Sequence, residues 1–162
     1  MTDHVVLKIC GIDYAVPAAL WSVLDGPRPD PSDFLDSDGC SFAPDVVRWL
    51  ARRFGTGGIP IILFPACWIH DAQYRRVPGA DLGGTRDARV HADAYLARNL
   101  AALCRVHGTS RAGTAAIVTT YWLAVRAFGA AAYHYDEGLR PAGRLQRLYE
   151  AFLYPLEAPI LK

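Results

Sequence analysis

The sequence predicts a mainly α-helical fold with irregular N-terminal loops. Apolar residues recur at helical spacing over residues 64–76, 87–106 and 111–133, and no segment alternates for long enough to indicate a sheet. Similar stripes over residues 46–54 and 144–153 predict two further helices. The three long helices are expected to form the core, with the first two antiparallel because the connection between them is short.

The N-terminal region carries turn signals rather than a long helical pattern. Residues 25–32 contain Pro27, Pro29 and Pro31, and a helix cannot continue through such a run. One short helix is expected within residues 15–24. The polar residues 36–44 are expected to form an irregular loop.

Length and charge limit the class of protein. The 162 residues are enough for a single domain, which would bury roughly 70% of the surface of the unfolded chain. The family resemblance described below implies a core over residues 36–133, with extensions over residues 1–35 and 134–162. The formal net charge is only +1, so no strong positive field is available to attract phosphate backbones, and no nucleic-acid partner is expected.

Neither a signal peptide nor a membrane span is expected. The N-terminus has an early acidic residue and lacks a basic segment followed by an apolar one. The apolar run over residues 59–69 is about half as long as a bilayer requires, and two prolines interrupt it. We therefore expect synthesis in the cytoplasm. The four cysteines include no Cys-x-x-Cys pair, which argues against a zinc site.

A histidine and several carboxylates lie beside apolar helical positions. In antiparallel helices, His70 of the first and Asp93 of the second can face each other. A carboxylate that accepts a hydrogen bond from one imidazole nitrogen fixes the tautomer, so the other nitrogen can act as a base toward water. Asp71 points about 100° away around the helix. If a disulfide joins Cys40 to Cys67, Asp38 and a backbone carbonyl such as that of Gly39 would lie near Asp71 and offer, with it, hard oxygen ligands of the kind that calcium prefers.

Four stretches carry a resemblance to a known family. They are residues 38–45 (Asp-Gly-Cys-Ser-Phe-Ala-Pro-Asp), residues 66–75 (Ala-Cys-Trp-Ile-His-Asp-Ala-Gln-Tyr-Arg), Asp93 with Cys104 eleven residues later, and residues 121–129. In this order they resemble the small prokaryotic and fungal phospholipases A2, over about residues 36–130. The chain also resembles an uncharacterised phage-associated family with a similar His-Asp-x-x-Tyr element.

The resemblance implies a catalytic role for three residues. His70 matches the general base that takes a proton from the water attacking the sn-2 ester of a glycerophospholipid. Asp93 matches the carboxylate that orients this histidine, and Tyr74 matches the tyrosine that hydrogen-bonds to the carboxylate. The expected protein is a carboxylic ester hydrolase acting at a membrane lipid surface.

The resemblance also implies a cofactor and a disulfide. Asp38, Asp71 and the backbone carbonyl of Gly39 match the ligands of a calcium ion (Ca²⁺), which would stabilise the oxyanion. Cys40 and Cys67 match a disulfide of the family, although two buried thiols are the alternative.

Two features depart from the family and leave a second interpretation open. Cys104 matches a half-cystine, but no cysteine follows it, so that it either pairs with Cys10 or both are free thiols. The terminal segments have no counterpart in the family. The alternative is therefore a non-catalytic structural or binding component of a phage particle, whose terminal segments contact virion or tail proteins. Virion association, or release at lysis, would follow from the phage resemblance.

Overall fold

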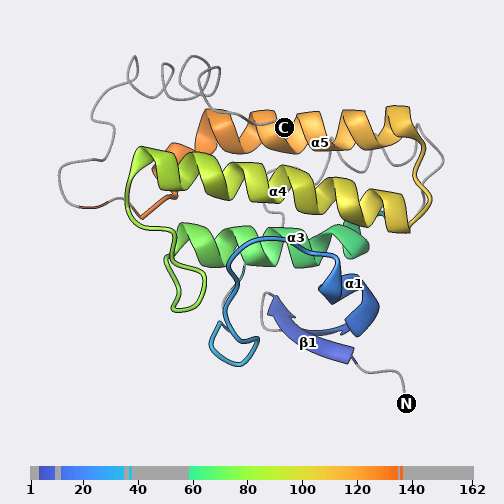
Figure 1. Cartoon of the computed structure of the whole chain (residues 1–162), viewed down its shortest axis with the longest axis horizontal. Helices are drawn as coiled ribbons and strands as arrows, with labels where there is room; N and C mark the ends of the chain where they lie inside the picture. The colour runs from blue at the N-terminus through green and yellow to red at the C-terminus, as the bar shows by residue number, and fades with distance from the viewer. Residues whose placement is uncertain (1–3, 10–11, 35–36, 38–58, 135, 137–162) are drawn as a thin grey trace.

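The computed structural model describes residues 4–9, 12–34, 37, 59–134 and 136. Most of its regular structure is helical, which confirms the predicted class (Figure 1). In chain order the elements are strands β1 (His4–Ile9) and β2 (Ile12–Pro17), helices α1 (Ala18–Ser22), α3 (Ile59–Tyr74), α4 (Arg86–Val106) and α5 (Arg111–Phe128), and the 3₁₀ helix η1 (Gly129–Ala131).

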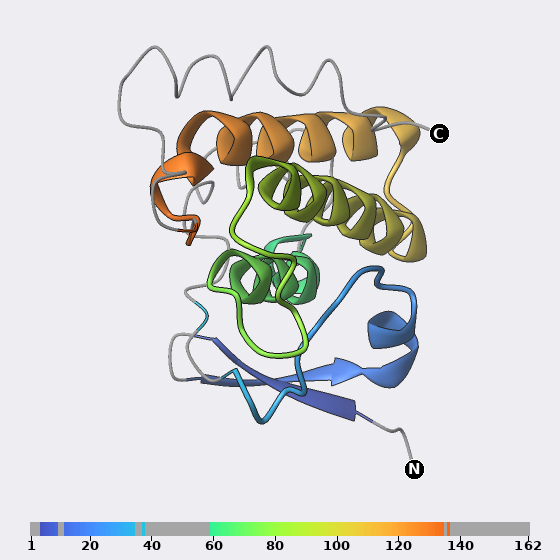
Figure 2. The ribbon, with the colours of Figure 1, turned by 60° about the vertical axis from the view of Figure 1, so that its left-hand side comes forward.

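The three long helices lie side by side in antiparallel order, with α4 between α3 and α5 (Figures 1 and 2). The hairpin of β1 and β2 packs with α1 on the side of α3 that faces away from α4. Helix α3 is consequently covered from both sides. Its side chains at five apolar positions are at most 1% exposed: Leu63, Ala66, Trp68, Ile69 and Ala72. Residues 59–69 of α3 are all apolar, as expected for a helix segment in such a central place.

Helix α3 begins at Ile59, five residues before the expected start. Proline is tolerated in the first turn, where an N–H has no helical partner, so Pro60 does not prevent the early start. The helix ends in a left-handed turn: Arg76 has φ +57°, and Val77 N donates to the carbonyl of Ala72 at 3.0 Å. This is a Schellman arrangement, here without the usual glycine.

Helices α4 and α5 begin within one residue of their expected starts because each has a side-chain cap. Thr85 Oγ1 accepts from Ala88 N before α4, and Ser110 Oγ accepts from Gly113 N before α5. The third helix was expected to reach residue 133 but ends at Phe128, where η1 follows.

The hairpin corrects the expectation that the chain contains no sheet. The strands β1 and β2 are antiparallel and pair Leu7 with Tyr14 and Val5 with Val16. Leu7 and Val16 are buried. The ring of Tyr14 packs edge-on against that of Phe64 on α3, with 5.2 Å between the ring centroids. Val6 and Ile12 are exposed although they are apolar, so apolar and polar residues do not alternate in these strands and no strand pattern stands out in the sequence.

The proline-rich segment that follows α1 is tied to the helices by polar contacts. Asn99 on α4 accepts from Asp25 N at 2.7 Å and donates to the Asp25 carbonyl at 3.1 Å. Gln73 on α3 donates to the Pro27 carbonyl at 2.9 Å. Further along, Phe34 packs against Trp68. The expected loop is thus a covering layer on α3 and α4.

The helices expected over residues 46–54 and 144–153 lie outside the described residues, as does most of the loop over residues 36–44. Among the helices that are described, none is long and apolar enough to cross a membrane.

Candidate active site

Side chains from three helices meet around one buried carboxylate, at the end of the bundle where α3 ends and α4 begins. Asp93 on α4 is fully buried. Its Oδ1 lies 3.1 Å from Nε2 of His70 and accepts a hydrogen bond of 2.5 Å from the Tyr74 hydroxyl, both on α3. Its Oδ2 accepts a hydrogen bond of 2.7 Å from Nη1 of Arg126 on α5. The expected contacts of Asp93 with His70 and Tyr74 are therefore present.

Helix geometry explains the meeting of these groups. His70 and Tyr74 are four residues apart, so they occupy the same face of α3 on successive turns, and their ring centroids are 4.0 Å apart. Helix α4 packs antiparallel to α3 (Figure 1), and Asp93 on α4 contacts both residues. Gly129 leaves room for Tyr74, since a Cβ at this glycine would lie 3.0 Å from Cε1 of the tyrosine ring.

The charges around Asp93 keep it ionised. Burial alone raises the pKa of a carboxyl group, but here the hydrogen bond and charge of His70 and the charges of Arg89 and Arg126 outweigh burial. They hold the pKa of Asp93 below its usual value. For Tyr74 the effect is opposite: burial, followed by the negative charge of Asp93, raises the pKa of its hydroxyl well above the usual value. Tyr74 therefore remains a protonated donor.

These protonation states fix the tautomer of His70. An ionised carboxylate only accepts hydrogen bonds, so Nε2 must carry the proton that points to Asp93. In the neutral imidazole the basic lone pair is then on Nδ1. Within the described part of the chain Nδ1 makes no hydrogen bond, and this atom is not completely buried. His70 as a whole is 6% exposed.

Asp71, the next residue on α3, faces a different neighbour, as expected from the helical rotation. It is half-buried, and its Oδ2 accepts a hydrogen bond of 2.7 Å from Oγ of Ser37, which is fully buried. The two other expected calcium ligands, Asp38 and Gly39, follow Ser37 directly in the sequence but lie outside the described residues. Of this segment the structure places Ser37, which lies at Asp71.

Of the expected ligands only Asp71 can be placed. The described residues contain no group of three or more His, Cys, Asp and Glu side chains that could hold a metal ion. A half-buried carboxylate on a rigid helix suits a hard cation such as calcium. Asp71 therefore fits the chemistry of the expected site, and the set of ligands stays a prediction.

The cysteines are described in part. Cys67 is disulfide-bonded, whereas Cys104 is a buried free thiol whose pKa is raised by burial. Cys10 and Cys40 lie outside the described residues. The free thiol rules out the alternative in which Cys104 pairs with Cys10, and the disulfide between Cys40 and Cys67 stays a prediction.

Sequence reasoning missed Arg126, Arg89 and Ser37. One signal for Arg126 was available, because it is the only charged residue between positions 112 and 131. A lone charge in so long an apolar segment indicates a buried partner of opposite charge. No comparable signal marks Ser37, which is a common residue in a polar loop.

The chain matches none of the protein-family models, curated proteins or solved structures with which it was compared. The case for a function therefore rests on the residues around Asp93.

Proposed function

We propose that this protein is a calcium-dependent, phospholipase A2-like esterase that hydrolyses the sn-2 ester of membrane glycerophospholipids. The proposal rests on the buried Asp93, whose Oδ1 accepts hydrogen bonds from both His70 Nε2 and the Tyr74 hydroxyl. A carboxylate that holds an imidazole in one tautomer is the arrangement needed to activate water.

In the proposed reaction His70 acts first as a base and then as an acid. Its Nδ1 takes a proton from a water molecule while the water oxygen forms a bond to the ester carbonyl carbon. Asp93 stabilises the positive charge that develops on the imidazole. The bond between the carbonyl carbon and the glycerol oxygen then breaks, and the proton on Nδ1 passes to that oxygen. The products are a fatty acid and a lysophospholipid, with no covalent intermediate on the protein.

Asp71, with Asp38 and the carbonyl of Gly39 as the resemblance implies, would hold the calcium ion. When bound, calcium polarises the ester carbonyl and balances the charge of the oxyanion. Support for this assignment comes from the hydrogen bond between Ser37 and Asp71, because Ser37 precedes the two other expected ligands in the sequence.

One observation favours the second candidate, a non-catalytic structural or binding component of a phage particle. His70 is only 6% exposed and Asp93 is fully buried, so the cluster also suits a hydrogen-bonded network that stabilises a core. In that case the terminal segments, and not the cluster, would carry the contacts to virion or tail proteins.

The deciding experiment measures fatty-acid release from vesicles of phosphatidylglycerol and phosphatidylethanolamine, with calcium or with a chelator. The wild type is compared with His70→Ala and with His91→Ala, a matched control at an exposed position of α4. We expect release that requires calcium and falls at least about 10²-fold in His70→Ala, while His91→Ala retains wild-type activity.

Two outcomes would refute the proposal. One is the absence of release by the folded wild type, which would favour the phage-particle component. The other is equal release by the wild type and His70→Ala, which would remove His70 from the chemistry.

A further inference from the structure

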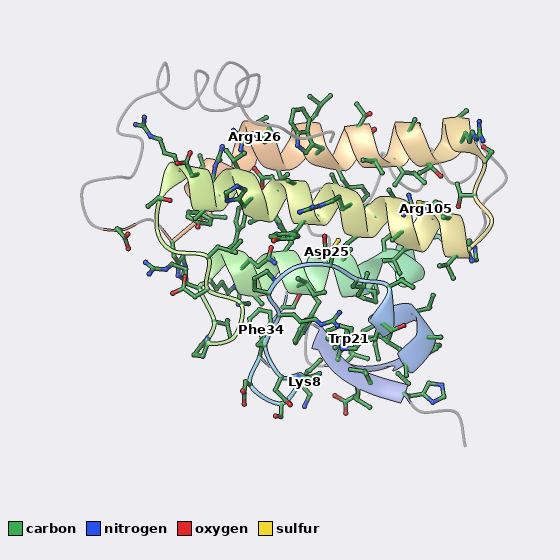
Figure 3. All side chains as sticks on the ribbon, in the orientation of Figure 1. Lys8, Trp21, Asp25, Phe34, Arg105 and Arg126 are labelled. Carbon is green, nitrogen blue, oxygen red and sulfur yellow. The ribbon has the colours of Figure 1, made fainter. Side chains whose placement is uncertain are left out.

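Arg126 is buried in the cluster to an unusual degree for an arginine. Its side chain is 1% exposed, and its Nη1 donates to Asp93 Oδ2 at 2.7 Å. It comes from α5 (Figure 3), whereas the groups on the other oxygen, from His70 and Tyr74, come from α3. The carboxylate is therefore held from two sides by two different helices.

Stability alone does not explain a buried guanidinium in this position. Removing its charge from water costs several kcal/mol, and a well-packed apolar side chain in its place often gives a protein of equal or higher stability. Arginine is always charged and only donates hydrogen bonds. Whatever group it faces must therefore present an acceptor. Facing Asp93, Arg126 occupies Oδ2 and leaves Oδ1 for His70 and Tyr74.

We propose that Arg126 is a positioning residue: by fixing Oδ2 of Asp93 it makes Oδ1 face Nε2 of His70, and so keeps the proton on Nε2 and the lone pair on Nδ1. Its role in catalysis rests on the proposed esterase function. The orientation of Asp93 and the tautomer of His70 can be measured without any substrate.

The test uses the isosteric variant Asp93→Asn, in which the carboxamide has one accepting and one donating end. Because Arg126 must face an acceptor, we expect the amide oxygen to turn to Arg126 and the NH₂ group to His70. Nε2 then has to accept a hydrogen bond, and the proton moves to Nδ1. The nitrogen chemical shifts of ¹⁵N-histidine-labelled protein, recorded with the imidazole neutral, report this change. His70→Gln assigns the signals.

The double variant Asp93→Asn/Arg126→Met shows whether Arg126 imposes the change. Without the guanidinium the amide oxygen is free to face His70, so we expect the signals to return at least partly toward the wild-type pattern. Arg111→Met in the Asp93→Asn background is the matched control, since Arg111 is exposed at the start of the same helix, and it should leave the shifted tautomer unchanged.

Either of two results would overturn the proposal: His70 keeps its Nε2 proton in Asp93→Asn, or the double variant retains the shifted tautomer. The first result is decisive on its own, so the test does not depend on the folding of an Arg126 variant. If the double variant does not fold, Asp93→Asn/Arg126→Gln replaces it.

Activity is a separate readout. If the protein is an esterase, Asp93→Asn should lower turnover by no more than His70→Ala does, because the base remains but is in the wrong tautomer. If the wild type releases no fatty acid while the tautomer still shifts as expected, the proposed function fails and the positioning role of Arg126 stands.

Discussion

The hydroxyl of Tyr74 should contribute measurably to stability, and Tyr74→Phe isolates this contribution. The hydroxyl donates to the Asp93 carboxylate at 2.5 Å, and the residue is 5% exposed. A buried hydrogen bond to a charged group contributes about 1.5–3 kcal/mol. The substitution leaves the ring packing intact, so we expect a loss of this size in the free energy of unfolding. At about 2–4 °C per kcal/mol for a chain of this length, the melting temperature should fall by roughly 3–12 °C.

Urea unfolding followed by circular dichroism measures the difference. Tyr121→Phe is the matched control, because Tyr121 is also 5% exposed while its hydroxyl makes no hydrogen bond to a described residue. We expect this control to change stability by less than about 0.5 kcal/mol. Equal effects of the two substitutions would show that the bond to Asp93 adds nothing, and the account of the cluster as a set of charge-assisted hydrogen bonds would be wrong.

Two further predictions concern the same cluster. The pKa of Asp93 is lower in the folded protein than its value of about 3.9 in the unfolded chain. The ionised carboxylate therefore contributes its full stability above the unfolded pKa, and this stability is lost as the pH falls through the folded pKa. Acid titration of stability should therefore be steeper for the wild type than for Asp93→Asn, and parallel curves would contradict the shift. Gly129→Ala should destabilise the fold, because the added Cβ meets the Tyr74 ring. An unchanged melting temperature for Gly129→Ala would show that the ring moves aside without loss.

The meeting of His70 with Asp93 could be predicted because it depends on local rules. A clear helical period on both sides of a short connection implies antiparallel helices, and the spacing of four residues places Tyr74 beside His70. The partner on the other side of Asp93 could not be predicted in this way. Arg126 is 33 residues further along the chain, and an arginine in a helix is usually exposed.

The errors in the fold have equally specific causes. The hairpin was missed because exposed apolar residues such as Val6 and Ile12 break the alternation that marks a strand. The start of α3 was placed too late because Pro60 and Pro65 interrupt the apolar run, although the first turn of a helix accepts Pro60 and the helix continues through Pro65. Asn99 shows a third limit: its pairing with Asp25 spans 74 residues, and no local pattern predicts so distant a partner.

The central place of α3 has a consequence for the lifetime of the site. Over residues 63–74 most of its side chains are buried, with α4 on one side and the hairpin and α1 on the other (Figure 2), so we expect the amides of this stretch to exchange with deuterated solvent mainly when large parts of the fold open together. His70 and Tyr74 share this helix. Their arrangement around Asp93 therefore persists as long as the native state itself, and fluctuations of surface loops leave it unchanged.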